Sequence, residues 1–312
     1  MKVLVTGADG FVGRYVLSAL RTGGHDVVAC HRSEAKIPAW SEGAIEWRPL
    51  ELGDGASVAT AVAGTFDGVL HLAALSSGSA ARRDPGLAWE VNAAGTARVV
   101  EALAQGRRQG SPGPVVVVVS SGEVYGSAGR KPIDETMPAR PVSPYAASKL
   151  GAEEATRETA RRTGLRVIIA RPFAHTGPGQ LSDFVAPAFA RRLRAARAAG
   201  EPTVSTGNLE PVRDFVDVRD VARAYLALLV SGVPGETYNI ASGVGVTLRD
   251  LFDRLAALIG VQVEPVPDPA LVRTADIPYL VGNAAKFAAA TGWSPQIPLD
   301  QTLRDLTHAE TD

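Results

Sequence analysis

Cysteine is almost missing from this sequence, since Cys30 is the only one among 312 residues. No disulfide can form within the chain, and we expect a reducing location, the cytoplasm. The five histidines are scattered, and with one cysteine they show no spacing typical of metal ligands. The sequence therefore predicts neither a disulfide framework nor a metal site.

Charge excess and long apolar runs are missing too. The formal net charge is −1, so no overall field favours nucleic acid or an anionic membrane as a partner. No stretch approaches the ~18 apolar residues of a membrane span. The opening MKVLVTG predicts a strand and a glycine turn rather than a secretory signal. What is present, 46% hydrophobic residues, is typical of a globular protein with a large core.

Short β-branched runs alternate with alanine-rich segments of helical periodicity in the first half of the chain. Strands are predicted at residues 2–7, 26–30, 68–74, 114–121 and 165–172, with helices at 12–22, 92–105 and 144–163. Continuous apolar strands separated by helices indicate a parallel sheet covered on both faces. Because such crossovers are right-handed, the predicted fold is α/β with a doubly wound, mostly parallel Rossmann sheet.

The pattern changes after Pro172. Helices are predicted at 186–199 and 247–259, mixed segments at 213–230 and 236–243, and short proline-rich turns after them. We expect residues 1–172 with about 213–243 to form a dinucleotide-binding domain, and residues 173–212 with about 244–312 a smaller α/β substrate domain over the carboxyl edge of the sheet. Four arginines on the 186–199 helix indicate a solvated face, or alternatively an acidic partner.

A glycine motif lies between the first predicted strand and helix. The segment TGADGFVG (6–13) contains Gly7, Gly10 and Gly13. The first glycine permits the turn, the second lets the backbone approach a pyrophosphate at the helix N-terminus, and the third allows close helix–strand packing. A purely structural turn is the alternative. The strand–turn–helix context favours a dinucleotide site.

The end of the second predicted strand bears on which dinucleotide binds. An NAD-binding protein usually has an acidic residue there for the ribose hydroxyls, but this chain reads CHRS. The guanidinium of Arg32 suits a 2′-phosphate, which favours NADP(H). Glu34 lies close by and keeps NAD(H) open. Glu51, in the segment LELGD (50–54) between the strands at 26–30 and 68–74, is either an acceptor for the adenine amino group or a plain surface carboxylate.

Tyr145 and Lys149 form a Y-x-x-x-K pair within SPYAASK (143–149). Their i,i+4 spacing puts both on one helix face. A tyrosine with its ordinary pKa of ~10 is a poor acid or base at neutral pH, and a nearby ammonium is expected to lower that pKa by ~1–3 units. Ser121 ends the preceding strand and could hold a substrate oxygen beside Tyr145. A chance match is the alternative for an isolated pair of this kind.

These motifs, in this order, resemble the extended short-chain dehydrogenase/reductases, a family of nucleotide-sugar epimerases, dehydratases and reductases. The likeness covers essentially the whole chain and includes TGADGFVG, HLAA (71–74), VNAAGT (91–96), SSGEVYG (120–126), SPYAASK, RPFAHTGPGQ (171–180), RDFVDVRD (213–220), RTADIP (273–278) and TGWSPQIPL (291–299). Within the family, HTGPGQ, GNLEPVRDFVDVRDVARAY and ADIPYLVGN are most similar to GDP-4-keto-6-deoxy-D-mannose reductases.

The resemblance implies a set of site residues. Its catalytic residues are Ser121, Tyr145, Lys149 and Glu123. Its cofactor residues are Gly7, Gly10, Phe11, Val12, Gly13, His31, Arg32, Glu51, Leu52, Leu72, Ala73, Ala74, Asn92, Tyr145 and Lys149. Its substrate residues are Ser76, Ser121, Ala174, His175, Arg213, Arg273 and Asp276. Asn92 would brace the active-site helix, and Arg213 would clamp a diphosphate unless it forms a salt bridge with Asp214 or Asp217.

Two positions qualify this expectation. Glu123 lies where related 4,6-dehydratases have a glutamate base, although reductases carry it too; it could instead cap a turn. Ala174 stands where relatives usually have an asparagine that reaches the sugar diphosphate. Alanine cannot make that hydrogen bond, so either another group supplies the contact or the substrate differs from that of the relatives. His175 is expected to shape the cleft rather than to act as a base.

The expected activity is NAD(P)H-dependent reduction of the C4 ketone of a nucleoside-diphosphate 4-keto-6-deoxy-hexose, with a GDP-sugar favoured and a GDP-rhamnose type of product. An epimerase or dehydratase that retains its dinucleotide is the same-class alternative. A non-catalytic dinucleotide sensor or scaffold is the alternative from another class. The family also implies a homodimer through the helices near 92–105 and 144–160.

Overall fold

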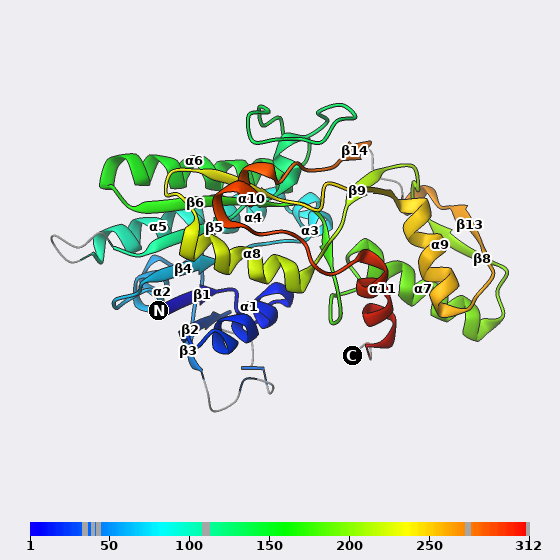
Figure 1. Cartoon of the computed structure of the whole chain (residues 1–312), viewed down its shortest axis with the longest axis horizontal. Coiled ribbons are helices and arrows are strands. Elements are labelled where there is room, and N and C mark those ends of the chain that lie inside the picture. The colour runs from blue at the N-terminus through cyan, green and yellow to red at the C-terminus, as the bar shows by residue number, and fades with distance from the viewer. Residues whose placement is uncertain (33–36, 39–40, 42–44, 108–112, 272–275, 310–312) are drawn as a thin grey trace.

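The computed structural model describes residues 1–32, 37–38, 41, 45–107, 113–271 and 276–309 (Figure 1). Its centre is a seven-stranded sheet of order β11-β6-β5-β4-β1-β2-β3 in which every neighbouring pair is parallel. The strands are β1 (Lys2–Thr6), β2 (Asp26–His31), β3 (Glu46–Pro49), β4 (Gly68–His71), β5 (Val115–Val119), β6 (Arg166–Pro172) and β11 (Thr237–Ile240). The predicted doubly wound α/β fold is confirmed.

The apolar strands form a continuous sheet because both faces are buried. Alternate side chains of β5 enter two different cores: Val117 lies in one cluster, and Val116 and Val118 in the other. This is the period of two that a strand imposes. A run of valines suits such a position, since neither face of the strand meets water.

Helices cover each face of the sheet (Figure 1). The first core contains residues of α1 (Phe11–Thr22) and α8 (Val218–Ser231), and the second contains residues of α2 (Gly55–Ala61) and α5 (Gly95–Gln105). α6 (Pro144–Thr163) packs beside α5 and begins as its sequence predicts, because Ser143 caps it by accepting a hydrogen bond from the Ala146 amide at 3.1 Å.

The helix expected from Asn92 begins differently. Two short helices, α3 (Gly78–Arg83) and α4 (Pro85–Ala88), lead into a π-helix, η2 (Trp89–Ala94), which continues as α5. π-helical turns often occur at functional sites. This one faces α6 closely, since a Cβ on Gly151 would lie 2.6 Å from the Trp89 ring.

A further core, called here the outer core, lies to one side of the main sheet, at the right of Figure 1. It is formed by α7 (Val185–Ala199), α9 (Leu248–Ile259) and α11 (Leu299–His308). Small sheets accompany it: β8 (Thr203–Thr206) with β13 (Glu264–Pro267), and β9 (Val212–Asp214) with β12 (Gly245–Thr247) and β14 (Tyr279–Leu280). β7 (His175–Thr176) pairs with β10 (Val216–Asp217). The other elements formed by the described residues are η3 (Gly122–Tyr125), η4 (Pro269–Leu271) and α10 (Ala285–Thr291).

The expectation of only short turns near the C-terminus is wrong, because α11 is a regular amphipathic helix. Leu303 and Leu306 are buried in the outer core, with Leu299 packed against it. Their spacing of four and three residues is the helical period that could have revealed it. Within the described part of the chain, no helix has the length and apolar character needed to cross a membrane.

The arginines of α7 do not form one solvated face. Arg194 donates to the Thr307 carbonyl at 2.6 Å, and Arg197 to the Ile259 carbonyl at 2.7 Å. Both carbonyls lie in the last turns of neighbouring helices, where the helix itself supplies no donor. These two arginines therefore join α7 to α11 and α9.

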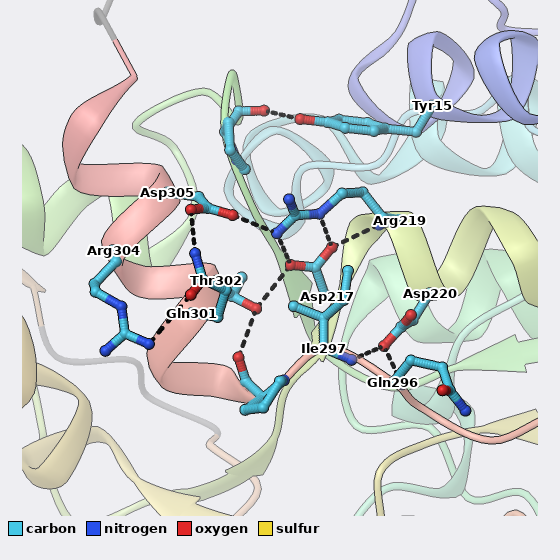
Figure 2. A network of polar contacts seen from close by, with 12 residues as sticks. Tyr15, Asp217, Arg219, Asp220, Gln296, Ile297, Gln301, Thr302, Arg304 and Asp305 are labelled. Carbon is cyan, nitrogen blue, oxygen red and sulfur yellow. Dashed lines mark hydrogen bonds and ion pairs between the residues drawn. The ribbon is translucent and has the colours of Figure 1, made fainter.

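A polar network joins α11 to the start of α8 (Figure 2). The buried Asp217 carboxylate accepts from Arg219 at 2.8 and 2.9 Å and from the Thr302 hydroxyl at 2.7 Å. Arg219 also donates to Asp305 at 2.7 Å. Tyr15 of α1 donates to the Pro178 carbonyl at 2.7 Å. The outer core is thus linked to the main sheet by polar contacts as well as by the chain.

Candidate active site

A cavity of about 450 Å³ lies where the main sheet meets the outer core. One wall consists of segments that follow β4, β5 and β6, and the other comes from α7 and the loops around β9. Because parallel strands all end at the same edge, the residues after them gather there. Every predicted catalytic residue lines this cavity, as do the predicted substrate residues Ser76, Ser121, Ala174, His175, Arg213 and Asp276. Arg273 lies outside the described residues.

The turn between β1 and α1 has the shape that a dinucleotide phosphate needs. Gly7 has a φ of +67°, and a Cβ there would lie 2.7 Å from the Ala73 amide nitrogen. A Cβ on Gly13 would lie 2.5 Å from the Ala8 carbonyl oxygen. Only glycine lets these backbones approach so closely. These glycines therefore pack the turn against the segment after β4 and against the helix it opens.

The N-terminus of α1 is open to an anion. Its cap residue is Gly10, and in this described segment no side chain caps the helix and no acidic residue occupies its first turn. The first amides of a helix have no partner inside the helix, and they carry partial positive charge. Phe11 and Val12 follow directly, and Val12 lines the cavity. These residues fit a nicotinamide dinucleotide, with its pyrophosphate at the helix end.

Other predicted cofactor residues follow β2 and β3. Arg32 is exposed directly after β2, and its carbonyl oxygen hydrogen-bonds the His31 ring at 2.7 Å. Glu51 is exposed, and its amide donates to the Ser57 hydroxyl at 2.9 Å. Leu52 is buried. None of these four predicted residues lines the cavity described above, and Glu34 lies outside the described residues.

Asn92 joins the segment after β4 to the helix that carries Tyr145 and Lys149. Its side chain accepts from the Leu75 amide at 2.8 Å and donates to the Ser148 hydroxyl at 2.9 Å. It is buried in the π-helix η2. Leu72, Ala73 and Ala74 precede Leu75 in the same segment, and Leu72 and Ala74 line the cavity.

Ser121, Glu123 and Tyr145 are neighbours at the sheet edge. Ser121 follows β5 and caps η3 by accepting from the Glu123 amide at 3.1 Å. Burial raises the pKa of the Tyr145 phenol, and the charge of Glu123 raises it further, while a hydrogen bond with Ser121 acts in the opposite direction. Tyr145 therefore keeps its proton at neutral pH.

The expected lowering of the Tyr145 pKa by Lys149 is not found in this structure. The Lys149 ammonium group donates to the Val119 carbonyl at 2.6 Å, at the end of β5. Burial lowers the pKa of Lys149 to about 8, and the charge of Glu153 partly opposes this. Burial dominates both groups because desolvation disfavours whichever form is charged. A protonated phenol suits a proton donor better than a base.

The far wall of the cavity carries an ion pair. Arg213 donates to Asp276 at 2.6 Å, and both side chains are largely buried. The alternative that Arg213 pairs with Asp214 or Asp217 is wrong. Asp214 accepts from the Ser242 hydroxyl and from backbone amides, and Asp217 pairs with Arg219.

Ala174 and His175 lie between the two walls. Ala174 packs against the outer core, and its carbonyl accepts from the Val216 amide at 2.9 Å. The His175 ring hydrogen-bonds the Phe173 carbonyl at 3.1 Å, and burial lowers its pKa. The ring also stacks on Phe11 of α1, with centroids 6.5 Å apart. A neutral imidazole held this way forms part of the cavity wall.

Sequence reasoning missed several residues that line the cavity. Arg192 of α7 is half-buried there and donates to the Ser205 carbonyl at 3.2 Å, whereas the sequence predicts a solvated helix face or an acidic partner for the arginines of this helix. Asn208 lies on the same wall, and Tyr225 of α8 is buried near Tyr145. Helical periodicity could have placed Tyr225 on the inner face of α8, but nothing local distinguishes Arg192 from its neighbours.

The fold and the site together define a class: a Rossmann-fold enzyme with a nicotinamide-dinucleotide turn and a serine–tyrosine–lysine set at one edge of the sheet. Comparison with known sequences gives the family. The model of the NAD dependent epimerase/dehydratase family matches residues 3–241, and the chain belongs to that family. It is an NAD(P)-dependent enzyme of nucleotide-sugar chemistry.

Individual relatives share the whole length of the chain. A GDP-6-deoxy-D-mannose reductase of Pseudomonas aeruginosa is 35% identical over 98% of this chain and 95% of its own. The structure of RMD from Pseudomonas aeruginosa complexed with NADPH has a TM-score of 0.82 at 33% identity, covering 98% and 97%. The UDP-glucose 4-epimerase of Thermus thermophilus in complex with NAD has a TM-score of 0.85 at 29% identity, covering 98% of both chains.

Proposed function

We propose that this protein is a reductase that converts the C4 ketone of a GDP-4-keto-6-deoxy-hexose to an alcohol. The observation that carries the proposal is the convergence of Ser121, Tyr145 and Lys149 with Arg213 and Asp276 around one cavity. The similarity to a GDP-6-deoxy-D-mannose reductase supports the choice of substrate and reaction.

The reaction needs a hydride at the carbonyl carbon and a proton at the carbonyl oxygen. The reduced dinucleotide, when bound, supplies the hydride. Tyr145 donates the proton, since burial raises its pKa and keeps it protonated. Ser121 is positioned to hydrogen-bond the same oxygen as negative charge develops on it. The Lys149 ammonium would hold the nicotinamide ribose.

The outer part of the cavity would bind the nucleoside diphosphate. Arg192 and Arg213 both line it, and guanidinium groups suit a dianionic diphosphate. Arg192 would also supply a hydrogen-bond donor for the diphosphate, which the side chain of Ala174 cannot provide. Asp276, already oriented by Arg213, would accept from the ribose hydroxyls.

NADP(H) is the proposed dinucleotide. Arg32 is exposed directly after β2, where a planar guanidinium can face a 2′-phosphate. The complex of RMD with NADPH supports this choice, whereas the epimerase complex with NAD keeps NAD(H) as the alternative.

We also propose a homodimer formed through α5 and α6. Leu87 and Trp89, next to these helices, are 43% and 47% exposed, which favours an apolar contact between copies. The proposed location is the cytoplasm, in keeping with Cys30 as a free thiol.

A 4-epimerase or 4,6-dehydratase is the second candidate, and Glu123 is the observation that favours it. Its charge acts on Tyr145, so a carboxylate lies beside the proposed proton donor. A dehydratase needs such a second base to remove a proton next to a ketone. Both of these enzymes would retain their dinucleotide through the cycle.

The test is to incubate the purified protein with GDP- and dTDP-4-keto-6-deoxy sugars while following the absorbance of NADPH and NADH. We expect stoichiometric oxidation of NADPH with the GDP-sugar. Tyr145→Phe should lower kcat by about 100-fold or more with little change in dinucleotide binding. Tightly held dinucleotide with no net oxidation would favour the epimerase or dehydratase. No oxidation with any sugar, or full turnover by Tyr145→Phe, would contradict the proposal.

A further inference from the structure

A buried carboxylate lies directly behind the proposed catalytic residues. Glu153 is on α6, one turn after Lys149, and its side chain is 0% exposed. Ionised carboxylates are almost never fully buried without partners, because desolvation costs several kcal/mol. The partners of Glu153 therefore indicate what it holds in place.

Three elements meet at this carboxylate. Ser120, directly after β5, donates to it at 2.6 Å. Arg171 of β6 donates twice, at 2.8 and 2.6 Å, in the two-pronged geometry typical of strong ion pairs. Arg157 of α6 adds a bond at 2.8 Å. Glu153 thus connects α6 to the ends of both strands that flank the cavity.

Each of these elements delivers a part of the proposed site. Ser120 precedes Ser121, and the residues after Arg171 line the cavity. Lys149 lies four residues before Glu153, on the same helix face, and donates to Val119 at the end of β5. The helix is therefore fastened to the same strand end twice, once by Lys149 and once by Glu153.

The negative charge of Glu153 affects the protonation of Lys149. Burial alone would drive this amine toward its neutral form, and the charge of Glu153 acts against that. The hydrogen bonds and charges of Arg171 and its neighbours outweigh burial and lower the pKa of Glu153, so it stays ionised. The ionised Glu153 carboxylate therefore helps to keep Lys149 in its ammonium form at neutral pH.

Resting on the reductase function proposed above, we infer that Glu153 is a positioning residue of this site. Its carboxylate fixes the strand end that carries Ser121 to the helix that carries Tyr145 and Lys149. It also supplies the negative charge that keeps the Lys149 ammonium in its charged form. It does so without touching substrate or dinucleotide.

Other ionisable groups face this cluster from the surrounding elements. They are His71 of β4, Glu123 and Tyr125 of η3, Arg171 of β6, Tyr225 of α8, and Tyr145 and Arg157 of α6. Burial lowers the pKa of His71 to about 3, so it stays neutral in the range of interest. Burial raises the pKa of all three tyrosines, so they stay protonated there. Lys149 is then the group whose titration the charge of Glu153 controls near neutrality.

The test replaces Glu153 by glutamine, which keeps the shape and removes the charge. Lys149 is titrated directly in the whole protein by competitive acetylation at a series of pH values, read by mass spectrometry. For the wild type we expect a midpoint of about 8. For Glu153→Gln we expect it to fall by roughly one unit, and the fall of kcat at high pH should shift by the same amount.

Glu154→Gln is the matched control. Glu154 is the next residue of the same helix and also pairs with Arg157, but its side chain is 61% exposed. We expect its Lys149 midpoint and pH profile to equal those of the wild type. A Lys149 midpoint that is equal in Glu153→Gln and Glu154→Gln would overturn the inference.

A second variant separates positioning from stability. Glu153→Gln leaves the buried Arg171 guanidinium without a negative charge to balance it, so the unfolding midpoint of this variant should drop. The double variant Glu153→Gln with Arg171→Met removes both charges and should regain stability. In this double variant, the pH midpoint of Lys149 acetylation and kcat should both stay below their wild-type values. If kcat and the Lys149 midpoint recover together with stability, Glu153 has a structural role only, and the inference is wrong.

The two proposals fail in different ways. Acetylation of Lys149 needs neither substrate nor turnover. A shifted Lys149 midpoint in a protein that reduces no sugar would refute the reductase function and retain the charge role of Glu153. Reduction of the sugar by a protein whose Lys149 midpoint is the same with and without Glu153 would support the reductase function and refute the charge role of Glu153.

Discussion

At the scale of single residues, burial decides which groups of this site carry charge. The same desolvation that raises the pKa of Tyr145 lowers that of Lys149 to about 8 and that of His71 to about 3. Burial favours the uncharged form of each group, whatever its ordinary pKa. The site therefore presents a neutral phenol and one ammonium close to its titration point, and the buried imidazole of His71 on β4 is neutral as well.

His71 gives this effect a measurable consequence for stability. It is 2% exposed and bridges β1 and α5 through hydrogen bonds with Thr6 at 2.7 Å and Thr96 at 3.0 Å. Below the ordinary histidine pKa, His71 is protonated in the unfolded chain. In the folded protein it is protonated only at about pH 3 and below. Stability is therefore complete above the ordinary pKa and falls as the pH drops toward 3.

We expect His71 to cost the protein about 2 kcal/mol of unfolding free energy between about pH 7 and about pH 5. Urea unfolding at both pH values measures the loss. His71→Gln should be less stable than the wild type at both pH values. On acidification, however, its unfolding free energy should fall by about 2 kcal/mol less than that of the wild type. His308→Gln, which removes an exposed histidine of α11, should behave as the wild type does. Equal losses in all three proteins would contradict the prediction.

At the scale of elements, the turn between β1 and α1 has the least room for change. A Cβ on Gly13 would meet the Ala8 and Gly7 carbonyl oxygens at 2.5 and 2.6 Å. Backbone atoms cannot move aside as a flexible side chain can. Because the helix start forms the proposed phosphate site, a shift there affects stability and dinucleotide binding together.

Gly13→Ala should therefore lower the unfolding free energy by roughly 1–3 kcal/mol. It should also weaken NADPH binding by about tenfold or more, measured by fluorescence titration. Gly55→Ala is the control, since nothing lies within 4 Å of its added Cβ. It should leave binding unchanged and alter stability by less than about 1 kcal/mol. Unchanged NADPH binding by Gly13→Ala would show that this turn does not hold the phosphate.

At the scale of the whole molecule, the cavity exists only because two separately packed regions meet. The main sheet and its helix α6 supply Ser121, Tyr145 and Lys149, and the region around the outer core supplies Arg192 and Arg213. The network of Asp217, Arg219, Thr302 and Asp305 fastens α11 to α8 (Figure 2). The relative placement of the two walls therefore depends on polar contacts between distant segments.

The proposed dimer also belongs to this scale. We expect the wild type to have twice the mass of the 32.5 kDa chain in light scattering. Trp89→Glu places a charge in the proposed contact and should shift the protein toward monomer, because burying an unpaired charge is costly. Leu258→Glu, at a 39% exposed site on α9, should leave the mass unchanged. A monomeric wild type, or a Trp89→Glu variant of unchanged mass, would refute the proposed interface.

Local patterns in the sequence determined much of this protein. The β-branched runs predicted the main strands, and the glycine spacing located the turn before α1. The i,i+4 spacing put Tyr145 and Lys149 on one helix face. Such features are readable because strand and helix periods depend on neighbours along the chain. The C-terminal helix α11 was missed although Leu299, Leu303 and Leu306 carry the same kind of signal.

Only the tertiary structure decided the ion pairs and pKa values of the site and which residues form the far wall of the cavity. Arg213 pairs with Asp276 rather than with a nearby aspartate, and the two are 63 positions apart. Arg192 lines the cavity and is half-buried. The pKa of Tyr145 is raised rather than lowered. Desolvation and ion pairing depend on which distant segments surround a group, and spacing along the chain does not contain that information.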